Sequence, residues 1–356
     1  MIEQPSPSKR STESPTKSSS PYFRSPQFCN VVLSGLLVIV ILNALTMGRA
    51  NISFVTGLKI LFSRIIPIDP TWTQTLDCVV MDVRLPRVIA GLLVGAGLSV
   101  SGASFQGVFR NPLVSPHILG VASGAGFGAA IAILLFDNIV YIQISSFLFG
   151  LLSVGLTYSL SKIHKTTPIL MLVLSGIVVG SLFSALTSFI KYIADPMNKM
   201  PAIVFWLLGS LNHVANPDLV IVAPAFIICT AILLLVRWRI NLLAMGEEDA
   251  RALGVNTELL KAMIIICATV ITAAAVCISG IIGWIGIVIP HIGRLLVGSD
   301  HKNLLPASML IGAIYLVSVD TIARTALVIE IPIGILTAII GAPVFAYLLR
   351  RNRPGR

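Results

Sequence analysis

The stretch Ile281-Ile-Gly-Trp-Ile-Gly-Ile-Val-Ile-Pro-His-Ile-Gly-Arg294 marks this chain as more than a simple membrane anchor. It places three glycines, a proline, a histidine and an arginine inside an otherwise apolar run. An unsatisfied backbone group is costly in hydrocarbon, so a helix break at membrane depth persists only where protein or water satisfies the backbone. We therefore predict a polytopic membrane protein with an internal path. Helix breaks at Asn111-Pro112 and at Pro290-His291 are expected to flank that path.

Composition predicts an all-α integral membrane protein. Hydrophobic residues make up 56% of the chain and charged residues only 11%, whereas charged residues are about 25% of a soluble domain. The mean hydropathy is +0.93. Each crossing needs about 20 apolar residues, so the chain has room for about ten transmembrane helices. The apolar runs predict spans at 31–48, 87–109, 118–136, 139–161, 169–193, 218–236, 262–283, 286–298, 304–328 and 333–349.

The two ends of the chain differ from this membrane domain. Residues 1–29 are rich in serine, proline and basic side chains, which predicts a disordered cytoplasmic tail and not a cleaved signal peptide. We assign residues 30–350 to one transmembrane domain and residues 351–356 to a basic cytoplasmic C-terminus. An even number of spans puts both ends on the same side of the membrane.

Charge distribution supports this topology. The net charge of +10 and the pI near 9.7 come from short loops and tails, which follows the positive-inside rule and does not indicate a nucleic-acid-binding face. The basic loops 161–165 and 237–239 also fall on the inner side. Segment 49–87 disagrees with the rule, because it carries five basic residues yet should lie outside.

Small residues recur four positions apart in several spans, for example at Gly91 and Gly95. This spacing favours close packing of helix backbones. Segments 84–120 and 281–306 share an outline of a small-residue helix, a break containing proline, histidine and arginine, and a further helix. The outline is typical of an inverted repeat, whose interface carries the route in many transporters.

Span 169–193 is the candidate lining of the path. Its small and hydroxyl residues would form a smooth wall without a tight binding site: Ser175, Gly176, Gly180, Ser181 and Ser184. The alternative is that these hydroxyls bond only to their own helix.

A polar insert, Met245-Gly-Glu-Glu-Asp-Ala-Arg-Ala-Leu-Gly-Val-Asn256, interrupts the inner side. Acidic residues such as Glu247 and Glu248 in its first turn and Gly254 after Leu253 predict a short capped helix. We interpret this helix as a docking element for a cytosolic subunit. A solvated loop helix without a partner is the alternative.

Charged residues also occur near the outer ends of two spans. Asp320 and Arg324 are one helical turn apart and can pair, and Arg84 and Arg87 precede span 87–109. Arginine suits bidentate capture of carboxylates. We therefore predict that Arg84, Arg87 and Arg324 hold an acidic partner or an anionic solute, with anchoring at the lipid headgroups as the alternative.

Catalytic residues are not expected. The five histidines lack the spacing of a metal pair, and the five cysteines show neither a disulfide framework nor zinc-ligand spacing. The chain has no phosphate-binding Gly-x-x-x-x-Gly-Lys-Ser/Thr loop. We expect no metal site and no cofactor, and any ATP hydrolysis must take place in another chain.

Several ordered motifs together resemble the FecCD-type permeases, the membrane subunits of ATP-binding-cassette importers for iron–siderophore complexes, haem and cobalamin. The resemblance covers residues 30–350. The motifs are Arg84-Leu-Pro-Arg87, Ser101-Gly-Ala-Ser-Phe-Gln106, Arg110-Asn-Pro-Leu113, Met245-Gly-Glu-Glu-Asp-Ala-Arg-Ala-Leu-Gly254, Gly286-Ile-Val-Ile-Pro-His-Ile-Gly-Arg294, Leu305-Pro306 and Pro332-Ile-Gly-Ile-Leu-Thr-Ala-Ile-Ile-Gly-Ala-Pro343.

The resemblance implies a type II importer permease with ten transmembrane helices in a bacterial inner membrane. Two permease subunits, identical or paralogous, would enclose one path, rest on two cytosolic ATPase subunits and receive cargo from a periplasmic or lipid-anchored binding protein. The family's ATPase contact maps onto Gly246, Glu247, Ala250, Leu253 and Gly254, and its outer arginines map onto Arg84, Arg87 and Arg324.

The resemblance favours an iron(III)–siderophore complex as the cargo. Haem, cobalamin and oxyanions are alternatives. A cation-coupled secondary transporter would be a protein of another class, with Asp320 as the candidate ion site. An intramembrane enzyme would need a constellation of catalytic groups that the histidines do not supply.

Overall fold

The computed structural model describes residues 25–48, 50, 52–136, 138–162 and 168–351. Throughout this part of the chain the regular secondary structure is helical, as the composition predicted. The elements are α1 (Pro26–Thr46), α2 (Phe54–Phe62), α3 (Gln74–Cys78), the π-helix η1 (Val79–Arg84), α4 (Leu85–Val108), the 3₁₀ helix η2 (Pro116–Leu119), α5 (Val121–Leu135), α6 (Ile139–Ser161), α7 (Ile169–Ile193), α8 (Lys199–Leu207), α9 (Asn216–Met245), α10 (Glu247–Ala252), α11 (Thr257–Ser279), α12 (Ile285–Val297), α13 (His301–Thr325) and α14 (Ile333–Arg351).

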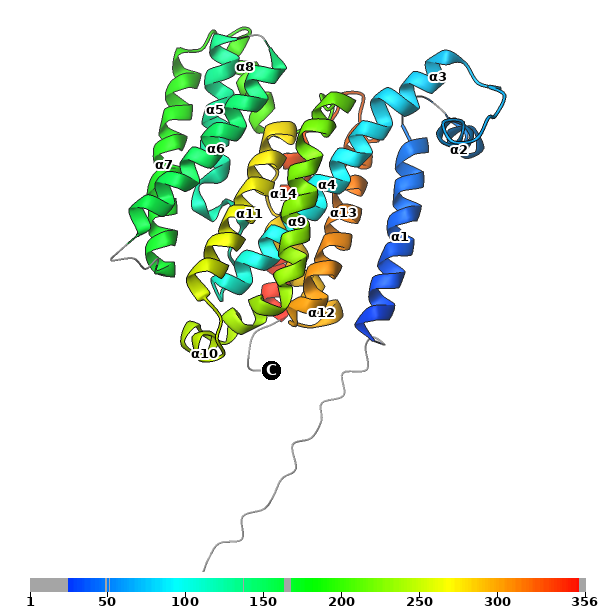
Figure 1. The fold of residues 1–356 in the computed structure, drawn as a ribbon. Coiled ribbons are helices and arrows are strands. Elements are labelled where there is room, and N and C mark those ends of the chain that lie inside the picture. Colours follow the sequence, from blue (N-terminus) through cyan, green and yellow to red (C-terminus); the bar gives the residue numbers. More distant parts are fainter. Residues whose placement is uncertain (1–24, 49, 51, 137, 163–167, 352–356) are drawn as a thin grey trace, which may run out of the picture.

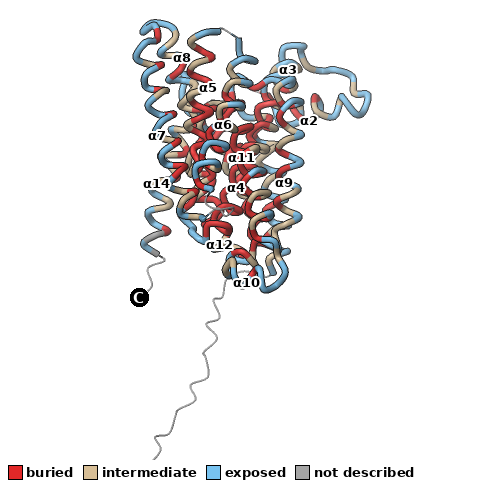
Figure 2. Tube along the Cα trace, turned by 60° about the vertical axis from the view of Figure 1, so that its left-hand side comes forward, coloured by how far each residue is buried: buried red, intermediate tan, exposed pale blue. Residues whose placement is uncertain are grey.

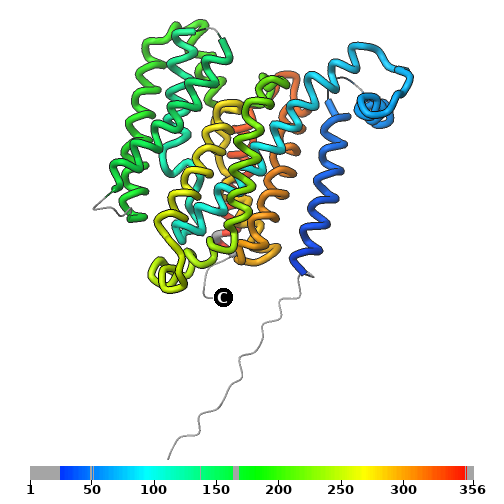
Figure 3. The backbone as a smooth tube through the Cα atoms, in the orientation of Figure 1, coloured from blue at the N-terminus to red at the C-terminus, as the bar shows by residue number. Residues whose placement is uncertain are grey.

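The apolar helices of the described chain agree in number with the ten predicted spans. Seven helices of the described chain are long and apolar enough to cross a membrane, and α5, α12 and α14 are shorter apolar helices beside them. Figure 1 shows these helices as one bundle. The bundle has two ends: the end with α10, called the inner end here, and the end with α2, α3 and α8, called the outer end (Figure 1). The chain enters α1 and leaves α14 at the inner end (Figure 3).

Helices α4 and α11 form the centre of the bundle. In each of them 78% of the most apolar window is buried, whereas only 22% is buried in α1, α6 and α9 and 28% in α7. Figure 2 shows the same contrast between a buried interior and exposed outer helices. The outer helices expose mainly apolar side chains, which is the surface that lipid requires.

Glycines let helix backbones approach α4 closely. A Cβ on Gly102 would overlap the backbone of Gly286 in α12, and a Cβ on Gly95 would overlap the backbone of Gly312 in α13. The predicted packing role of the small-residue spacing is therefore confirmed for Gly95. Replacement by any larger residue would push α13 or α12 away from the central helix.

One predicted helix break is wrong. Pro290 and His291 lie inside α12, which runs without interruption from Ile285 to Val297. Proline removes one backbone donor, which leaves the carbonyl of Gly286 without its helical partner. The side-chain amide of Gln106 donates to that carbonyl at 3.2 Å and replaces the missing bond. The break lies earlier, between the end of α11 at Ser279 and the start of α12.

Two predicted boundaries also need correction. Residues 237–239 are not an inner loop, because α9 continues to Met245 and buries Ile240 and Leu243 completely or nearly so. The predicted disordered tail 1–29 extends too far toward the membrane domain, because α1 begins at Pro26. Residues 1–24 and 352–356 lie outside the described part of the chain.

Candidate functional site

A buried ion-pair network occupies the outer end of the bundle. Arg87 of α4 donates from Nε to Asp320 of α13 at 2.7 Å and from Nη1 to Glu330 at 2.9 Å. Arg87 and Asp320 are buried, whereas the Glu330 side chain is 31% exposed. Arg324 lies 3.7 Å from the second oxygen of Asp320, so the predicted pairing of Asp320 and Arg324 is confirmed.

The same network holds the outer end of α1. Arg84 donates to the carbonyl oxygens of Leu45, Thr46 and Ala50 at 2.6 to 2.9 Å. Arg324 donates to the carbonyl of Ala44. The carbonyls of Ala44, Leu45 and Thr46 are at the C-terminal end of α1 and have no helical partner of their own, whereas Ala50 lies in the connection after α1.

The three arginines therefore do not form the outward-facing group that the sequence predicts. We expected guanidinium groups open to a partner, but Arg84, Arg87 and Arg324 are 3%, 5% and 7% exposed and are engaged within the chain. Arg84 ends η1 and Arg87 lies in the first turn of α4, at the outer end of the bundle, where α3 leads into α4 (Figure 1). Among them only the Arg87 network reaches the surface, through Glu330. Their role in docking a binding protein stays a prediction.

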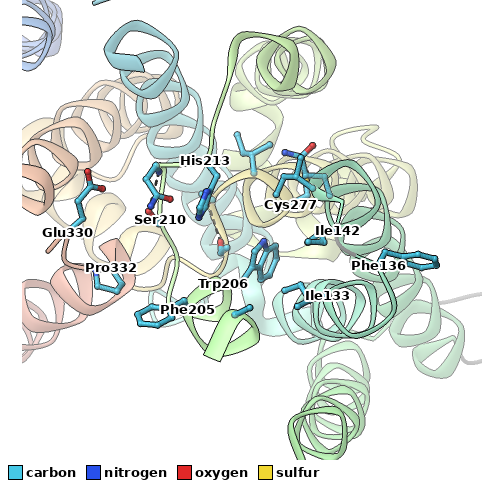
Figure 4. Close-up of a pocket in the computed structure, with 17 residues that line it drawn as sticks. Ile133, Phe136, Ile142, Phe205, Trp206, Ser210, His213, Cys277, Glu330 and Pro332 are labelled. Carbon is cyan, nitrogen blue, oxygen red and sulfur yellow. Dashed lines mark hydrogen bonds between the residues drawn. The ribbon is translucent and has the colours of Figure 1, made fainter. Parts of the chain in front are cut away.

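A cavity of about 540 Å³ opens beside this network. Figure 4 shows Glu330 and Ser210 toward one side of it, and Ile142 and Phe136 toward the other. Apolar side chains lie on the first side as well, since Pro332 and Phe205 are beside Glu330 and Ser210 (Figure 4). It is lined by Ile133, Phe136, Ile139, Ile142, Gln143, Ala202, Phe205, Trp206, Ser210, Asn212, His213, Cys277, Ile278, Ser279, Gly280, Glu330 and Pro332.

Non-helical backbone segments meet at the base of this cavity. Ser210 donates its N–H to the carbonyl of Ser279 at 2.8 Å, and Ile333 donates to Gly209 at 2.9 Å. Gly280 and Trp284 have φ values of +66° and +69°, which turn the chain from α11 into α12. The pairing between segments satisfies backbone groups that would otherwise be costly at this depth.

At the inner end, α10 is fixed to α11 by a cluster of four charges. Lys261 of α11 lies 3.1 Å from Glu247 and 2.7 Å from Glu258. Arg251 lies 3.3 Å from Glu247 and 3.6 Å from Glu258. Lys261 is only 5% exposed. The carboxylate of Glu247 therefore holds α10 in place from within the chain.

The predicted short inner helix is confirmed. It runs from Glu247 to Ala252 with three acidic residues in its first turn, and Gly254 follows with φ +80°. Ala250 is completely buried, whereas Leu253 is 63% exposed. Leu253 thus presents an apolar surface at the inner end, and Glu248 is exposed beside it.

Helix α7 places the candidate path residues on two faces. Ser175 and Gly176 are buried, and a Cβ on Gly176 would overlap the carbonyl of Ile118. Gly180 leaves room for a Cβ, and Ser181 and Ser184 are exposed. Gly176 therefore has a packing role, and the exposed face is the part of α7 available to a path. Asn111 and Pro112 lie between α4 and η2, outside any helix.

Sequence reasoning missed Lys261, Glu258 and Gln106. The spacing of Glu258 and Lys261, three residues apart at the start of an apolar span, could have indicated the ion pair. No local signal links Gln106 to Gly286, because their contact depends on the packing of α4 against α12. In the described part of the chain no group of histidine, cysteine and acidic residues is arranged to hold a metal ion.

Comparison with known proteins gives consistent matches. A sequence profile of the FecCD transport family matches residues 36–351. The molybdate import system permease protein MolB of Haemophilus influenzae is 43% identical over 325 residues, which are 91% of this chain and 95% of that protein. A permease of Helicobacter pylori named for iron chelatin transport is 42% identical over 280 residues, which are 79% of this chain and 85% of that protein.

A solved structure is also similar to this chain. It is described as an inward-facing conformation of an ABC transporter of metal-chelate type. Its TM-score is 0.81 at 41% identity, and the match covers 92% of this chain and 99% of that one.

Proposed function

We propose that this chain, which belongs to the FecCD transport family and is the permease subunit of an ATP-binding-cassette importer, translocates an iron(III)–siderophore complex. The protein is not an enzyme, because separate ATPase subunits hydrolyse ATP in this family. Membership also implies a substrate-binding protein and a second permease subunit as partners. The similarity to a solved metal-chelate type transporter over nearly the whole chain is the observation that carries the proposal.

Molybdate is the second candidate cargo. The Haemophilus influenzae relative named for molybdate import is 43% identical over 91% of this chain, slightly more than the relative named for iron chelatin. In either case a separate binding protein would deliver the cargo to the permease. Haem and cobalamin are further alternatives of the same kind.

A secondary transporter is disfavoured by the environment of Asp320. Its carboxylate is 2% exposed and lies between Arg87 at 2.7 Å and Arg324 at 3.7 Å. Two cationic neighbours oppose the binding of a coupling cation, since like charges repel across such distances. Asp320 therefore fits a structural ion pair better than an ion-carrying site.

The two ends of the bundle support an assignment of partners. The exposed Leu253 on α10 suits contact with an ATPase subunit at the inner, cytosolic end. The outer cavity suits the exit of cargo from a binding protein, with Glu330 and the Arg87 network at its edge. The exposed face of α7, with Ser181 and Ser184, lines the path toward the second permease subunit in this proposal.

Uptake into proteoliposomes tests the proposed cargo. The permease is reconstituted with its ATPase subunits and binding protein, and radioactive iron–siderophore, molybdate, haem and cobalamin are supplied in separate experiments. ATP-dependent uptake of the iron chelate alone supports the proposal, and uptake of molybdate alone replaces it with the second candidate. Uptake that persists without ATP but collapses with ionophores would contradict an ATP-driven importer.

The proposed contact between Leu253 and the ATPase subunits needs a separate test with a matched control. Leu253→Asp should release the ATPase subunits during purification, because it places a charge in an apolar contact. Leu259→Asp is the control, since Leu259 is 67% exposed on the first turn of α11. Retention of the ATPase subunits by the Leu253 variant would remove this residue from the interface.

A further inference from the structure

Helix α2 differs in direction from the spanning helices. Figure 1 views α2 along its own axis, whereas the neighbouring α1 runs upright at its side. The helix lies level with the outer end of α1, where α1 leads into it after a short connection. An orientation across the bundle at this level is the geometry of a helix that lies in a membrane interface.

One face of α2 is packed on the body of the protein. Ile60 is completely buried in a cluster with Ile52 and Val80, and Gly57 approaches Thr46 so closely that a Cβ would lie 3.0 Å from its methyl group. The hydroxyl of Ser53 accepts the N–H of Thr56 and caps the start of the helix. The position of α2 is therefore fixed by packing.

A second face of α2 and the turn after it is apolar and exposed. Five large side chains on this surface are between 48% and 80% exposed: Phe54, Val55, Phe62, Ile65 and Ile66. At 3.6 residues per turn, Phe54, Val55 and Phe62 fall within one sector of the helix. The turn is ordered, since Phe62 accepts backbone N–H groups from Ile65 and Ile66. Such a cluster is rare on a surface that faces water.

A narrow third sector of α2 is polar. By helical periodicity Thr56, Lys59 and Ser63 fall between the exposed apolar face and the buried face. Lys59 is exposed. The helix thus has one side for protein, one side for hydrocarbon and an edge for water, which is the arrangement required at the rim of a membrane protein.

The exposed apolar face continues a surface that already faces lipid. Helix α1 is a membrane span and exposes Val38 and Ile39 to 55% and 57%. Helix α2 contacts α1 and lies at its outer end. The lipid that covers α1 therefore extends to the level of α2.

We propose that α2 and the turn to Ile66 form an interfacial anchor that inserts its exposed apolar side chains into the lipid leaflet at the outer end. Lys59 points along the polar edge toward the lipid phosphates, as basic side chains do near an interface. The inference depends on the membrane location and not on the cargo.

The same placement explains the basic character of segment 49–87, which disagreed with the predicted topology. Arg84 and Arg87 are buried and bonded within the chain, and Arg64 pairs with Asp77 at 2.6 Å. Lys59 belongs to the interface, and the fifth basic residue, Arg49, lies outside the described part of the chain. These basic residues therefore have partners or a lipid-interface position on the outer side. Their presence there is compatible with the predicted topology.

Spin-label accessibility tests the anchor. Single cysteines replace Val55 and Ile65 in a Cys78→Ser background, because Cys78 is the exposed native cysteine and the other four are buried. The full-length protein is labelled and placed in vesicles of phosphatidylethanolamine and phosphatidylglycerol. Collision rates are measured with oxygen, which concentrates in hydrocarbon, and with a water-soluble nickel chelate.

The expected result is a several-fold higher oxygen-to-nickel ratio at Val55 and Ile65 than at the aqueous control Asp69→Cys. The ratio should approach that of Val38→Cys, which reports the lipid face of α1. A label at Lys59→Cys should give an intermediate ratio. Nickel collisions at Val55 and Ile65 as frequent as at Asp69 would place α2 in water and overturn the proposal. Protection from both reagents would show cover by protein and would overturn it as well.

Discussion

Lys261 and Glu247 form an ion pair at 3.1 Å that joins the short inner helix α10 to the central helix α11. Lys261 is 5% exposed and also lies 2.7 Å from Glu258, so one ammonium group pairs with two carboxylates, which Arg251 also contacts. The pair connects the element proposed to meet the ATPase with one of the two most buried helices. The ion pair therefore ties α10 to α11 in addition to the chain connection between them.

Lys261→Met should uncouple transport from ATP hydrolysis. The substitution leaves the half-exposed Arg251 as the remaining counter-charge of Glu247 and Glu258 in the cluster, and breaking a buried pair costs about 3–5 kcal/mol. The loss in free energy of unfolding should be about 3 kcal/mol or less, because the two carboxylates are 26% and 35% exposed and solvent screens their charge. The measurement is the number of cargo molecules transported for each ATP hydrolysed in proteoliposomes. Lys302→Met is the matched control, because Lys302 is exposed at the start of α13, outside the docking helix. An unchanged ratio in the Lys261 variant would refute the coupling role.

Asp320→Asn should destabilise the outer end of the bundle. The substitution removes the charge that Arg87 and Arg324 share, and the loss of one partner of a buried ion pair costs about 3–5 kcal/mol. Thermal unfolding in detergent measures the change. Glu330→Gln should cost less, because the Glu330 side chain is 31% exposed and solvent screens its charge. Equal stability of both variants would mean that the buried network contributes little.

Gln106→Leu should destabilise the packing of α4 against α12. The side-chain amide of Gln106 donates to the Gly286 carbonyl, which Pro290 leaves without a helical donor. An unsatisfied buried carbonyl costs about 1–3 kcal/mol. Pro290→Ala restores the helical N–H, so the double variant should regain part of the loss. Unfolding measured over the complete double-mutant cycle should show a coupling between the two sites, and additive losses would argue against this compensation.

Two glycines of α7 should respond differently to substitution. Gly176→Ala should impair folding, because the added Cβ would overlap the Ile118 carbonyl, whereas Gly180→Ala should be tolerated. Ser181→Trp should assemble normally, because Ser181 is exposed, and should block uptake if the exposed face of α7 lines the path. Gly155→Trp on α6 is the control, since a Cβ there meets nothing within 4 Å. Full transport by the Ser181→Trp variant would exclude this face from the path.

The sequence by itself determined the membrane class, the number of apolar helices and the inner capped helix. These features depend on local properties: the length of an apolar run, the acidic first turn at Glu247 and the glycine stop at Gly254. The pairing of Asp320 with Arg324 was also predictable, because residues four apart on a helix share a face.

Only the tertiary structure decided what the charged and irregular residues do. The sequence predicts free guanidinium groups at Arg84 and Arg87. In the structure, carbonyls at the end of α1 accept from Arg84 and the carboxylate of Asp320 in α13 pairs with Arg87, and these partners are far away in the sequence. Pro290 was read as a helix break, yet Gln106 satisfies the carbonyl that it frees. Local sequence shows which backbone or charged group needs a partner, but the packing of distant helices decides whether protein supplies that partner.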